Sequence, residues 1–337
     1  MKNSKKMLRN FTIFILLIGI TFYIILKDQN ISEICEVLNN VKIRYVLIAI
    51  LCMCGYLTLE AVNMGRTLNA LGEKSNVFSN IKYALIGFFY SSITPAASGG
   101  QPMQIYYMHK DKISVANSTL ALLINLCSFQ IISISFSFIS LSLNAKYLNT
   151  ALICFFAIGV TLNSIALILL LIGIFSKKMS AALIRFALKI MKFFRIKNLE
   201  EKQEKLEIEL NKYHGSSEYI KKNKFLMFKI LITTFVQILV YYSIPYWVYC
   251  SFGLSGYNIF EIITLQAVLY ATVSGIPSPG AVGVTEGGFL SIFKSVFPLE
   301  IISSAMLLNR GVSFYLFVFV AGIVAIISTL KEKKKTA

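Results

Sequence analysis

Long apolar runs separated by short polar segments dominate the hydrophobic pattern of this chain. A transmembrane helix needs about 20 predominantly apolar residues, and the uninterrupted runs of that length predict six full transmembrane helices. These runs are Leu8–Leu26, Tyr45–Asn63, Val115–Leu143, Thr150–Phe175, Phe225–Phe252 and Ser303–Leu330. The pattern therefore predicts an all-helical polytopic membrane protein.

Two further apolar stretches, residues 81–108 and 259–297, contain residues that break helices. Proline removes a backbone donor and glycine adopts conformations that other residues avoid, so a continuous helix cannot pass through either stretch. In hydrocarbon, a broken backbone persists only where protein covers it or where it lines a polar cavity. We expect a re-entrant helical hairpin at each stretch. The expected structural breaks are Pro95 in the first, and Pro277, Pro279 and Gly280 in the second.

The distribution of Lys and Arg predicts how these elements are oriented. Bases are concentrated on one side if the N-terminus is cytoplasmic and each hairpin enters and leaves on the same side. If residues 81–108 crossed fully, Lys110 and Lys112 would lie outside. The hairpins then enter from opposite faces, and their break sequences are alike, which is typical of an inverted-repeat transporter. We expect a multi-pass protein of the cell membrane with both termini in the cytoplasm.

Composition supports this class and argues against others. The 337 residues are 56% hydrophobic and 15% charged, with a mean hydropathy of +0.69, which is outside the range of soluble domains. The net charge of +17 comes from bases beside apolar runs, a pattern of contact with anionic lipid rather than with nucleic acid. The cysteines lie mostly in apolar runs, and no Cys or His spacing matches a metal site. We therefore expect no metal, no cofactor and no catalytic residue.

We expect a single integral membrane domain over residues 1–337, with one sizeable polar segment at 176–224. Residues 183–195 have the spacing of a basic amphipathic helix lying on the inner leaflet. Asn198–Tyr213 alternates Glu and Lys and predicts a solvated helix. The N-terminal apolar run resembles a secretory signal, but Lys27 and Asp28 follow it where a cleavage site needs small residues. We therefore predict a retained first helix.

The breaks also contain candidate binding residues. Ser98 and Gln101 have the spacing of a capping box, which predicts that Ser98 caps a half-helix. A helix start inside a membrane presents unpaired N–H groups and a positive dipole end, which suit a phosphate. The alternative is that both breaks serve packing alone. The candidate substrate-binding residues are Ser98, Gly99, Gly100, Gln101, Gly283, Thr285, Glu286 and Arg310.

Ionisable residues within apolar runs are functional candidates by default. Glu286 has four possible roles: complementing the helix dipole, pairing with a cationic headgroup, carrying a proton, or holding Arg310. Arg310 is expected either to bind lipid phosphate or to extend toward the membrane surface. Glu60 and Arg66, at the inner end of the second run, are interpreted as interface anchors.

Three segments resemble the lysylphosphatidylglycerol synthase/flippase integral-membrane family. They are ITPAASGGQPMQIYYMHKDKIS (93–114), GIPSPGAVGVTEGGF (275–289) and LLNRGVSFYLFVFVAGIVAII (307–327). The matching positions are Pro95, Gly99, Gly100, Gln101, Pro277, Pro279, Gly283, Glu286 and Arg310. Gln104 departs from the pattern, because relatives carry a base there.

The resemblance implies a flippase-like translocase that moves a phospholipid, such as lysylphosphatidylglycerol, or another lipid-linked headgroup between leaflets. Such a role bears on cell-envelope charge and on resistance to cationic antimicrobial peptides. Larger members carry a cytosolic domain that transfers lysine from tRNA to phosphatidylglycerol, and we expect no counterpart here. Phosphatidylglycerol lysyltransferase activity, with tRNA as a partner, is the alternative function. A third possible function is that of a membrane scaffold for a separate synthase. Besides the membrane phospholipid, the possible partners are that synthase and a second protomer.

Overall fold

The computed structural model describes residues 31–144, 150–178 and 199–336, together with the isolated residues 12, 16, 19, 23 and 182. All regular structure in these ranges is helical, as predicted. Two predictions, the first membrane helix (8–26) and the basic amphipathic helix (183–195), lie outside the described ranges.

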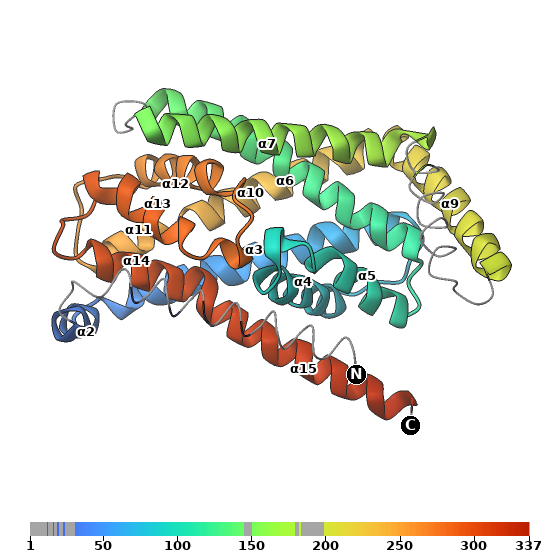
Figure 1. Ribbon diagram of the computed structural model, residues 1–337, viewed down its shortest axis with the longest axis horizontal. Helices are drawn as coiled ribbons and strands as arrows, with labels where there is room; N and C mark the ends of the chain where they lie inside the picture. Colours follow the sequence, from blue (N-terminus) through green and yellow to red (C-terminus); the bar gives the residue numbers. More distant parts are fainter. Residues whose placement is uncertain are drawn as a thin grey trace.

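Five helical segments are long and apolar enough to cross a membrane, judged by length and composition. They are Ile43–Ala70, Val115–Leu143, Thr150–Phe175, Lys224–Ser251 and Ile302–Lys331. Each coincides with a predicted run. The helices α3 (Ile43–Ala70), α6 (Val115–Asn144) and α7 (Thr150–Phe175) run along the long axis of the molecule (Figure 1).

The last two of these segments contain local irregularities. Lys224–Ser251 consists of α10 (Lys224–Tyr242) and α11 (Ile244–Ser251), with Pro245 in the first turn of α11. Proline is tolerated in a first turn but not inside a helix, which explains the interruption. Ile302–Lys331 consists of α14 (Ile302–Arg310), a π-helical turn η5 (Gly311–Tyr315), and α15 (Leu316–Thr336). Such π turns are frequent at functional sites, and this one begins directly after Arg310.

Both interrupted stretches fold as helical hairpins. In the first, α4 (Val77–Ser92) and α5 (Gly100–Lys110) pack against each other on either side of η1 (Pro95–Ala97). In the second, α12 (Ile259–Val273) and α13 (Val284–Ile292) do the same around η3 (Pro279–Ala281), and η4 (Phe293–Ser295) follows. We call them the first and the second hairpin.

The turns of the two hairpins share a conformation. In each, a proline is followed by two residues with positive φ. These are Ala96 (50°) and Ala97 (54°) in the first, and Gly280 (59°) and Ala281 (51°) in the second. Residues other than glycine rarely adopt this region. The match places Pro95 in register with Pro279, and Gly99 with Gly283.

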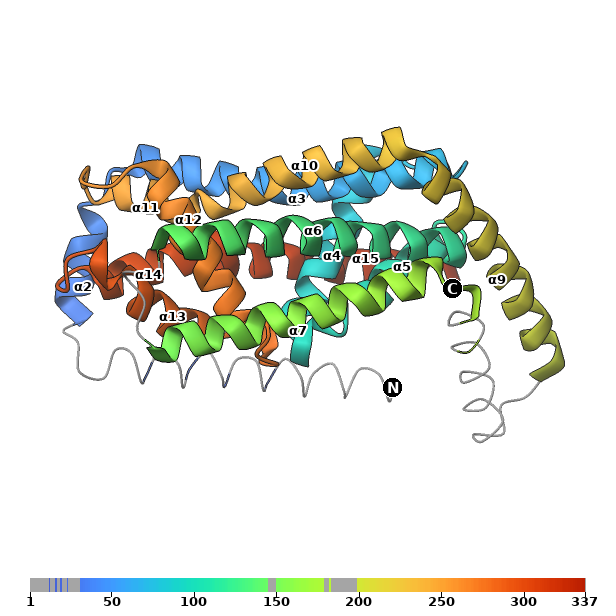
Figure 2. The same ribbon diagram turned by 90° about the horizontal axis from the view of Figure 1, so that it is seen from above.

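The hairpins occupy opposite halves of the molecule, and their turns meet. Figures 1 and 2 show α4 and α5 in one half, and α12 and α13 in the other. The two turns, η1 and η3, contact each other. The first hairpin packs through α4 against α3 and α15, and the second packs through α12 against α6 and α7. Two broken backbone segments are thereby brought to one place, enclosed by long helices.

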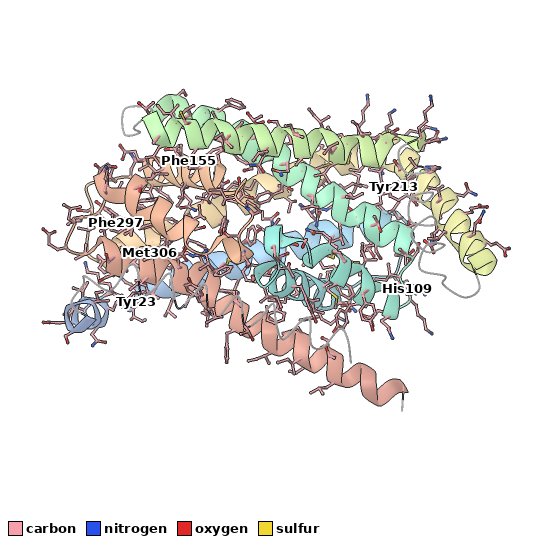
Figure 3. All side chains as sticks on the ribbon, in the orientation of Figure 1. Tyr23, His109, Phe155, Tyr213, Phe297 and Met306 are labelled. Carbon is pink, nitrogen blue, oxygen red and sulfur yellow. The ribbon has the colours of Figure 1, made fainter. Side chains whose placement is uncertain are left out.

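The side chains separate into a core and an apolar outer surface. The second hairpin contributes to the largest buried cluster, in which the rings of Phe289 and Phe293 stack with their centroids 4.4 Å apart. Phe155 on α7 is 51% exposed, as expected for a side chain facing lipid. Figure 3 labels Phe297 and Met306 in the half that holds the second hairpin, and His109 and Tyr213 in the opposite half.

A polar helix covers one end of this assembly. α9 (Leu199–Lys222) contains residues 199–213 of the helix predicted at Asn198–Tyr213 and extends beyond them. Its Glu209 carboxylate accepts hydrogen bonds from the backbone N–H of Ala116 (2.8 Å) and from the Ser114 hydroxyl (3.1 Å), at the start of α6. At the other end, α2 (Ile31–Asn39) packs against α14.

Candidate functional site

A cavity of about 350 Å³ lies where the turns of the two hairpins meet. We call it the inter-hairpin cavity. Both turns, α4, α12 and the Arg310 region contribute to its wall. Its lining includes Ser91, Ala96, Ala97, Gln266, Tyr270, Ser278, Gly280, Thr285, Arg310 and Phe314. Of the predicted site residues, Thr285 and Arg310 line this cavity, as do the predicted breaks Pro277 and Gly280.

Arg310 and Glu286 form a buried ion pair beside the cavity. The guanidinium Nε lies 2.7 Å from Glu286 Oε1, and the two residues are 5% and 1% exposed. Arg310 also donates from Nη2 to the Gly280 carbonyl (3.1 Å), and its guanidinium lies over the Phe314 ring. The arginine therefore connects α14 both to the turn of the second hairpin and to the helix that follows that turn.

Glu286 has a full set of partners. Its Oε2 accepts the backbone N–H of Gly283 (2.7 Å), and its Oε1 accepts both Arg310 Nε and the Tyr315 hydroxyl (2.8 Å). Of its four possible roles, the structure shows that of holding Arg310, together with the cap at the start of α13. Arg310 points to this carboxylate and the turn rather than extending toward the end of the molecule.

The first break is stabilised without charge, and here one prediction was wrong. Ser98 is exposed, and the N-cap of α5 is Gly99, which has no side-chain cap. Instead, the Thr94 hydroxyl accepts the Gly99 N–H (2.9 Å) and donates to the Tyr90 carbonyl (2.6 Å). The spacing of Ser98 and Gln101 suggested a capping box, but the turn satisfies this N–H with a residue from its other end. Gly100 is buried against Ser91, where a Cβ would overlap the hydroxyl.

Two residues that line the inter-hairpin cavity each have a buried polar atom with no hydrogen-bond partner in the described part of the chain. The atoms are Oε1 of Gln266, a residue that is 8% exposed, and Oγ of Ser278. A buried polar atom left unpaired costs about 1–3 kcal/mol. Such atoms therefore mark places where a water or a ligand group is accommodated.

A second cavity of about 230 Å³ adjoins the first along α4, and we call it the Glu60 cavity. Its lining includes Tyr56, Glu60, Ser91, Gln101, Gln104, Asn125, Phe129, Gln237 and Tyr270. Phe88, Ser91 and Tyr270 line both cavities. Gln101, a predicted site residue, lines this one.

Sequence reasoning missed Glu60, which is not an interface anchor. Its carboxylate faces the Glu60 cavity and is hydrogen-bonded by the Gln104 side chain. Gln104 occupies the space left by Gly87, where a Cβ would overlap its amide. The signal available in the sequence was an acid within an apolar run, but its polar neighbours come from distant segments. Arg66 donates to Asn63 and Thr233 and does not pair with Glu60.

A third cavity, of about 580 Å³, lies at the end covered by α9. It is basic, with Lys177, Lys221, Lys222 and Lys224 in its lining. His214 is also in its wall, where burial and the neighbouring Lys177 lower the pKa of the imidazole. No group of His, Cys, Asp or Glu suited to a metal ion occurs among the residues that the structure describes.

The fold and the cavities define a class: an integral membrane protein whose two broken helical hairpins meet in its interior. Residues 11–322 match the family described as the lysylphosphatidylglycerol synthase TM region. The chain belongs to this family, which confirms the resemblance. It is also 20% identical to a UPF0104 membrane protein of Archaeoglobus fulgidus, over 94% of this chain and 97% of that protein. A UPF0104 membrane protein of Pyrococcus horikoshii is 23% identical over 95% and 97% of the two chains.

Proposed function

We propose that this protein translocates phospholipids between the two leaflets of the cell membrane. The observation that carries the proposal is the inter-hairpin cavity, a partly polar space enclosed by helices with apolar outer surfaces. A lipid needs such a path for its headgroup, while its acyl chains remain in the bilayer. Broken helices whose ends converge on an internal site are typical of membrane transporters.

The polar groups of this cavity suit a headgroup phosphate. A guanidinium carries five N–H donors in a geometry that matches phosphate oxygens. The bonds from Arg310 to Glu286 and Gly280 use only part of this set, and Arg310 lines the cavity. The Thr285 and Ser278 hydroxyls and the Gln266 amide supply neutral partners. We assign the phosphate to this group of residues, with the start of α13 alongside.

We propose that the hairpins are re-entrant and that the basic end of the molecule faces the cytoplasm. Bases are concentrated at the end where α3 and α5 finish and where α9 lies (Figure 1). They include Arg66, Lys74, Lys82, Lys110, Lys112, Lys177, Lys212, Lys221, Lys222 and Lys224. At the opposite end the described bases are Lys42, Arg44 and Lys294. By the positive-inside rule, the first hairpin enters from the cytoplasm and the second from outside, with the C-terminus in the cytoplasm.

The family description names lysylphosphatidylglycerol, and we propose an amino-acid-modified or related phospholipid as the cargo. Moving a cationic lipid to the outer leaflet changes the charge of the cell surface, which links the protein to resistance against cationic peptides. Lysine transfer from tRNA and scaffolding of a separate synthase are the alternatives that the test must separate.

The test is exchange of fluorescent phospholipids in sealed vesicles that contain the purified protein. Anionic and lysyl-modified lipids carry a fluorescent label on the headgroup, and dithionite quenches those in the outer leaflet. Labelled lipids of the inner leaflet are quenched only after they have moved outward, so the rate of this slower quenching reports exchange. The informative variant is Gln266→Leu. It removes a polar atom that has no partner, so stability is expected to be unchanged or higher, while headgroup passage slows. Gln130→Leu is the control outside both cavities: Gln130 also has an unpartnered Oε1, but its Nε2 donates to Asn163 (3.0 Å), so this variant is expected to lose some stability while retaining exchange.

Faster exchange with wild-type protein, slowed by Gln266→Leu and retained in Gln130→Leu, supports translocation through the inter-hairpin cavity. Absence of exchange for both lipids contradicts the proposal. Lysine transfer from charged tRNA to phosphatidylglycerol by the same preparation would establish the enzymatic alternative instead.

A further inference from the structure

Glu60 is a carboxylate deep inside the membrane region. It lies ten residues before Ala70, the last residue of α3. At about 1.5 Å per residue this is ~15 Å from that end of the helix, which is half the thickness of a ~30 Å hydrocarbon core. Glu60 lines a partly polar cavity between α3, the first hairpin and α6.

No ion pair involves Glu60 within the ranges that the structure describes. The partner of its side chain is the neutral amide of Gln104. An ionised carboxylate without a cation is costly at this depth, and a proton removes the cost. Glu286, in the second hairpin, differs in its surroundings, because its oxygens hold Arg310, Tyr315 and the Gly283 N–H.

The titratable groups that face Glu60 are tyrosines rather than cations. Tyr56 and Tyr270 line the cavity, and Tyr241 packs against Tyr56 with ring centroids 4.8 Å apart. The sequence of α6 contains no acid or base, and Glu261 at the start of α12 is held in a capping box.

Bases on the packed helices are engaged elsewhere. On α3, Arg66 bonds Asn63 and Thr233, and on α4, Lys82 pairs with Asp111. Lys110 of α5 lies over Tyr106, and Lys229 of α10 lies over Phe225. Glu60 is thus the acid of this cavity, and a proton is the cation that the site can bind without further ligands.

The lining argues against a metal ion as the occupant. Metal ions in proteins are bound by several oxygen ligands, usually with more than one carboxylate among them, whereas this wall supplies a single carboxylate beside neutral amides, hydroxyls and the rings of Tyr56, Phe129 and Tyr270. One carboxylate among amides and aromatic rings is a poor metal site but a suitable proton site.

The Glu60 cavity also adjoins the path proposed for the headgroup. Ser91 and Tyr270 belong to the walls of both cavities, and Gln104, the partner of Glu60, belongs to α5 of the first hairpin. Protonation of Glu60 changes a hydrogen bond to the very element whose turn contacts the second hairpin. Through this contact, a proton on Glu60 and a headgroup in the inter-hairpin cavity influence each other.

We propose that Glu60 binds and releases a proton and that this step couples lipid translocation to the proton gradient. The coupling rests on the proposed function, whereas the proton site itself does not. The balance is simple: one H⁺ is taken up by the carboxylate from one side and released to the other, and no bond to the lipid is made or broken.

The proton site is tested with dicyclohexylcarbodiimide, which reacts with protonated carboxyl groups in apolar surroundings. Peptide mass spectrometry across a pH series is expected to find the adduct on Glu60, with labelling that falls as pH rises. Glu286, engaged in its ion pair, is the internal control and is expected to remain unlabelled. Labelling of Glu286 with none on Glu60 would overturn the assignment.

Coupling is tested in vesicles of phosphatidylglycerol and phosphatidylethanolamine that carry a pH gradient. With one proton per lipid, a gradient of one pH unit shifts the leaflet ratio of a labelled lipid by up to about tenfold. The leaflet ratio is expected to shift with wild type and with Glu60→Asp. Glu60→Gln is expected to exchange lipid without a shift in this ratio. An equal shift in wild type and Glu60→Gln, or a shift driven by sodium instead, would overturn the coupling. If no lipid exchanges at all, the proposed function fails, and the carbodiimide result still decides the proton site.

Discussion

The two acids inside the membrane region, Glu286 and Glu60, differ in what surrounds them. Glu286 is 1% exposed and accepts hydrogen bonds from an arginine, a tyrosine and a backbone N–H. Glu60 faces a cavity and is hydrogen-bonded by one neutral amide. The first acid has every partner that a buried carboxylate needs and so stabilises the fold. The second lacks a cation and so is available to a ligand.

The same contrast extends to the two hairpins. The second is held by charge, because Glu286 closes the start of α13 and Arg310 binds the turn. Near its turn the first is held by neutral contacts, with Thr94 across the turn and Gln104 against Gly87, and its ion pair, Lys82 with Asp111, lies at the other end of the hairpin. We infer that the turn of the second hairpin is the more rigid of the two and that the turn of the first is better suited to move.

The largest expected effect comes from making the same substitution at both acids. Glu286→Gln leaves Arg310 buried without its counter-charge, and breaking a buried pair in this way costs about 3–5 kcal/mol. Glu60→Gln breaks no ion pair and is expected to leave stability unchanged or slightly higher. Thermal unfolding of the purified protein in detergent measures both. Equal losses for the two variants would contradict the comparison.

A smaller effect is expected from alanine in the turn of the second hairpin. At Gly280, φ is +59° and a Cβ would overlap the Phe314 ring. We expect Gly280→Ala to cost about 1–2 kcal/mol for the left-handed backbone, with a further loss from the overlap. Gly72→Ala separates the backbone cost from the cost of the overlap, because Gly72 has a φ of +77° but nothing within 4 Å of a Cβ. If both variants lose the same stability by thermal unfolding, the overlap with Phe314 contributes nothing.

The smallest effect distinguishes two adjacent glycines of α13. A Cβ on Gly288 would lie 2.6 Å from Leu269 Cδ1, whereas one on Gly287 would meet nothing within 4 Å. We expect Gly287→Ala to stabilise by up to about 1 kcal/mol through helix propensity, and Gly288→Ala to lose that gain by crowding α12. The order of the two melting temperatures checks this packing, and the reverse order would contradict it.

Much of this architecture follows from local sequence. The proline and glycine clusters identify the breaks, and the apolar runs give the five long segments within the described ranges. Arg310 and Glu286 were both readable as ionisable residues at membrane depth. Their pairing was one of several alternatives, because nothing local fixes which residue a buried arginine meets.

The remainder depends on contacts between distant segments. Glu60 was interpreted as an anchor because its cavity is built by Gln104, Asn125 and Gln237, which are separated from it by 44 to 177 positions. Ser98 was assigned as a cap because the spacing was right, yet Thr94 supplies the oxygen from across the turn. The π-helical turn after Arg310 has no sequence signal that periodicity detects.

The most direct test of the central claim is to locate a bound lipid headgroup. A phospholipid with a photoreactive diazirine on its headgroup is incorporated into vesicles with wild-type protein, irradiated, and mapped by peptide mass spectrometry. We predict cross-links to residues that line the inter-hairpin cavity, above all Thr285, Ser278 and Ala97, reduced by excess unlabelled lipid. Cross-links confined to lipid-facing residues such as Phe155, with none in the cavity, would contradict translocation between the two hairpins.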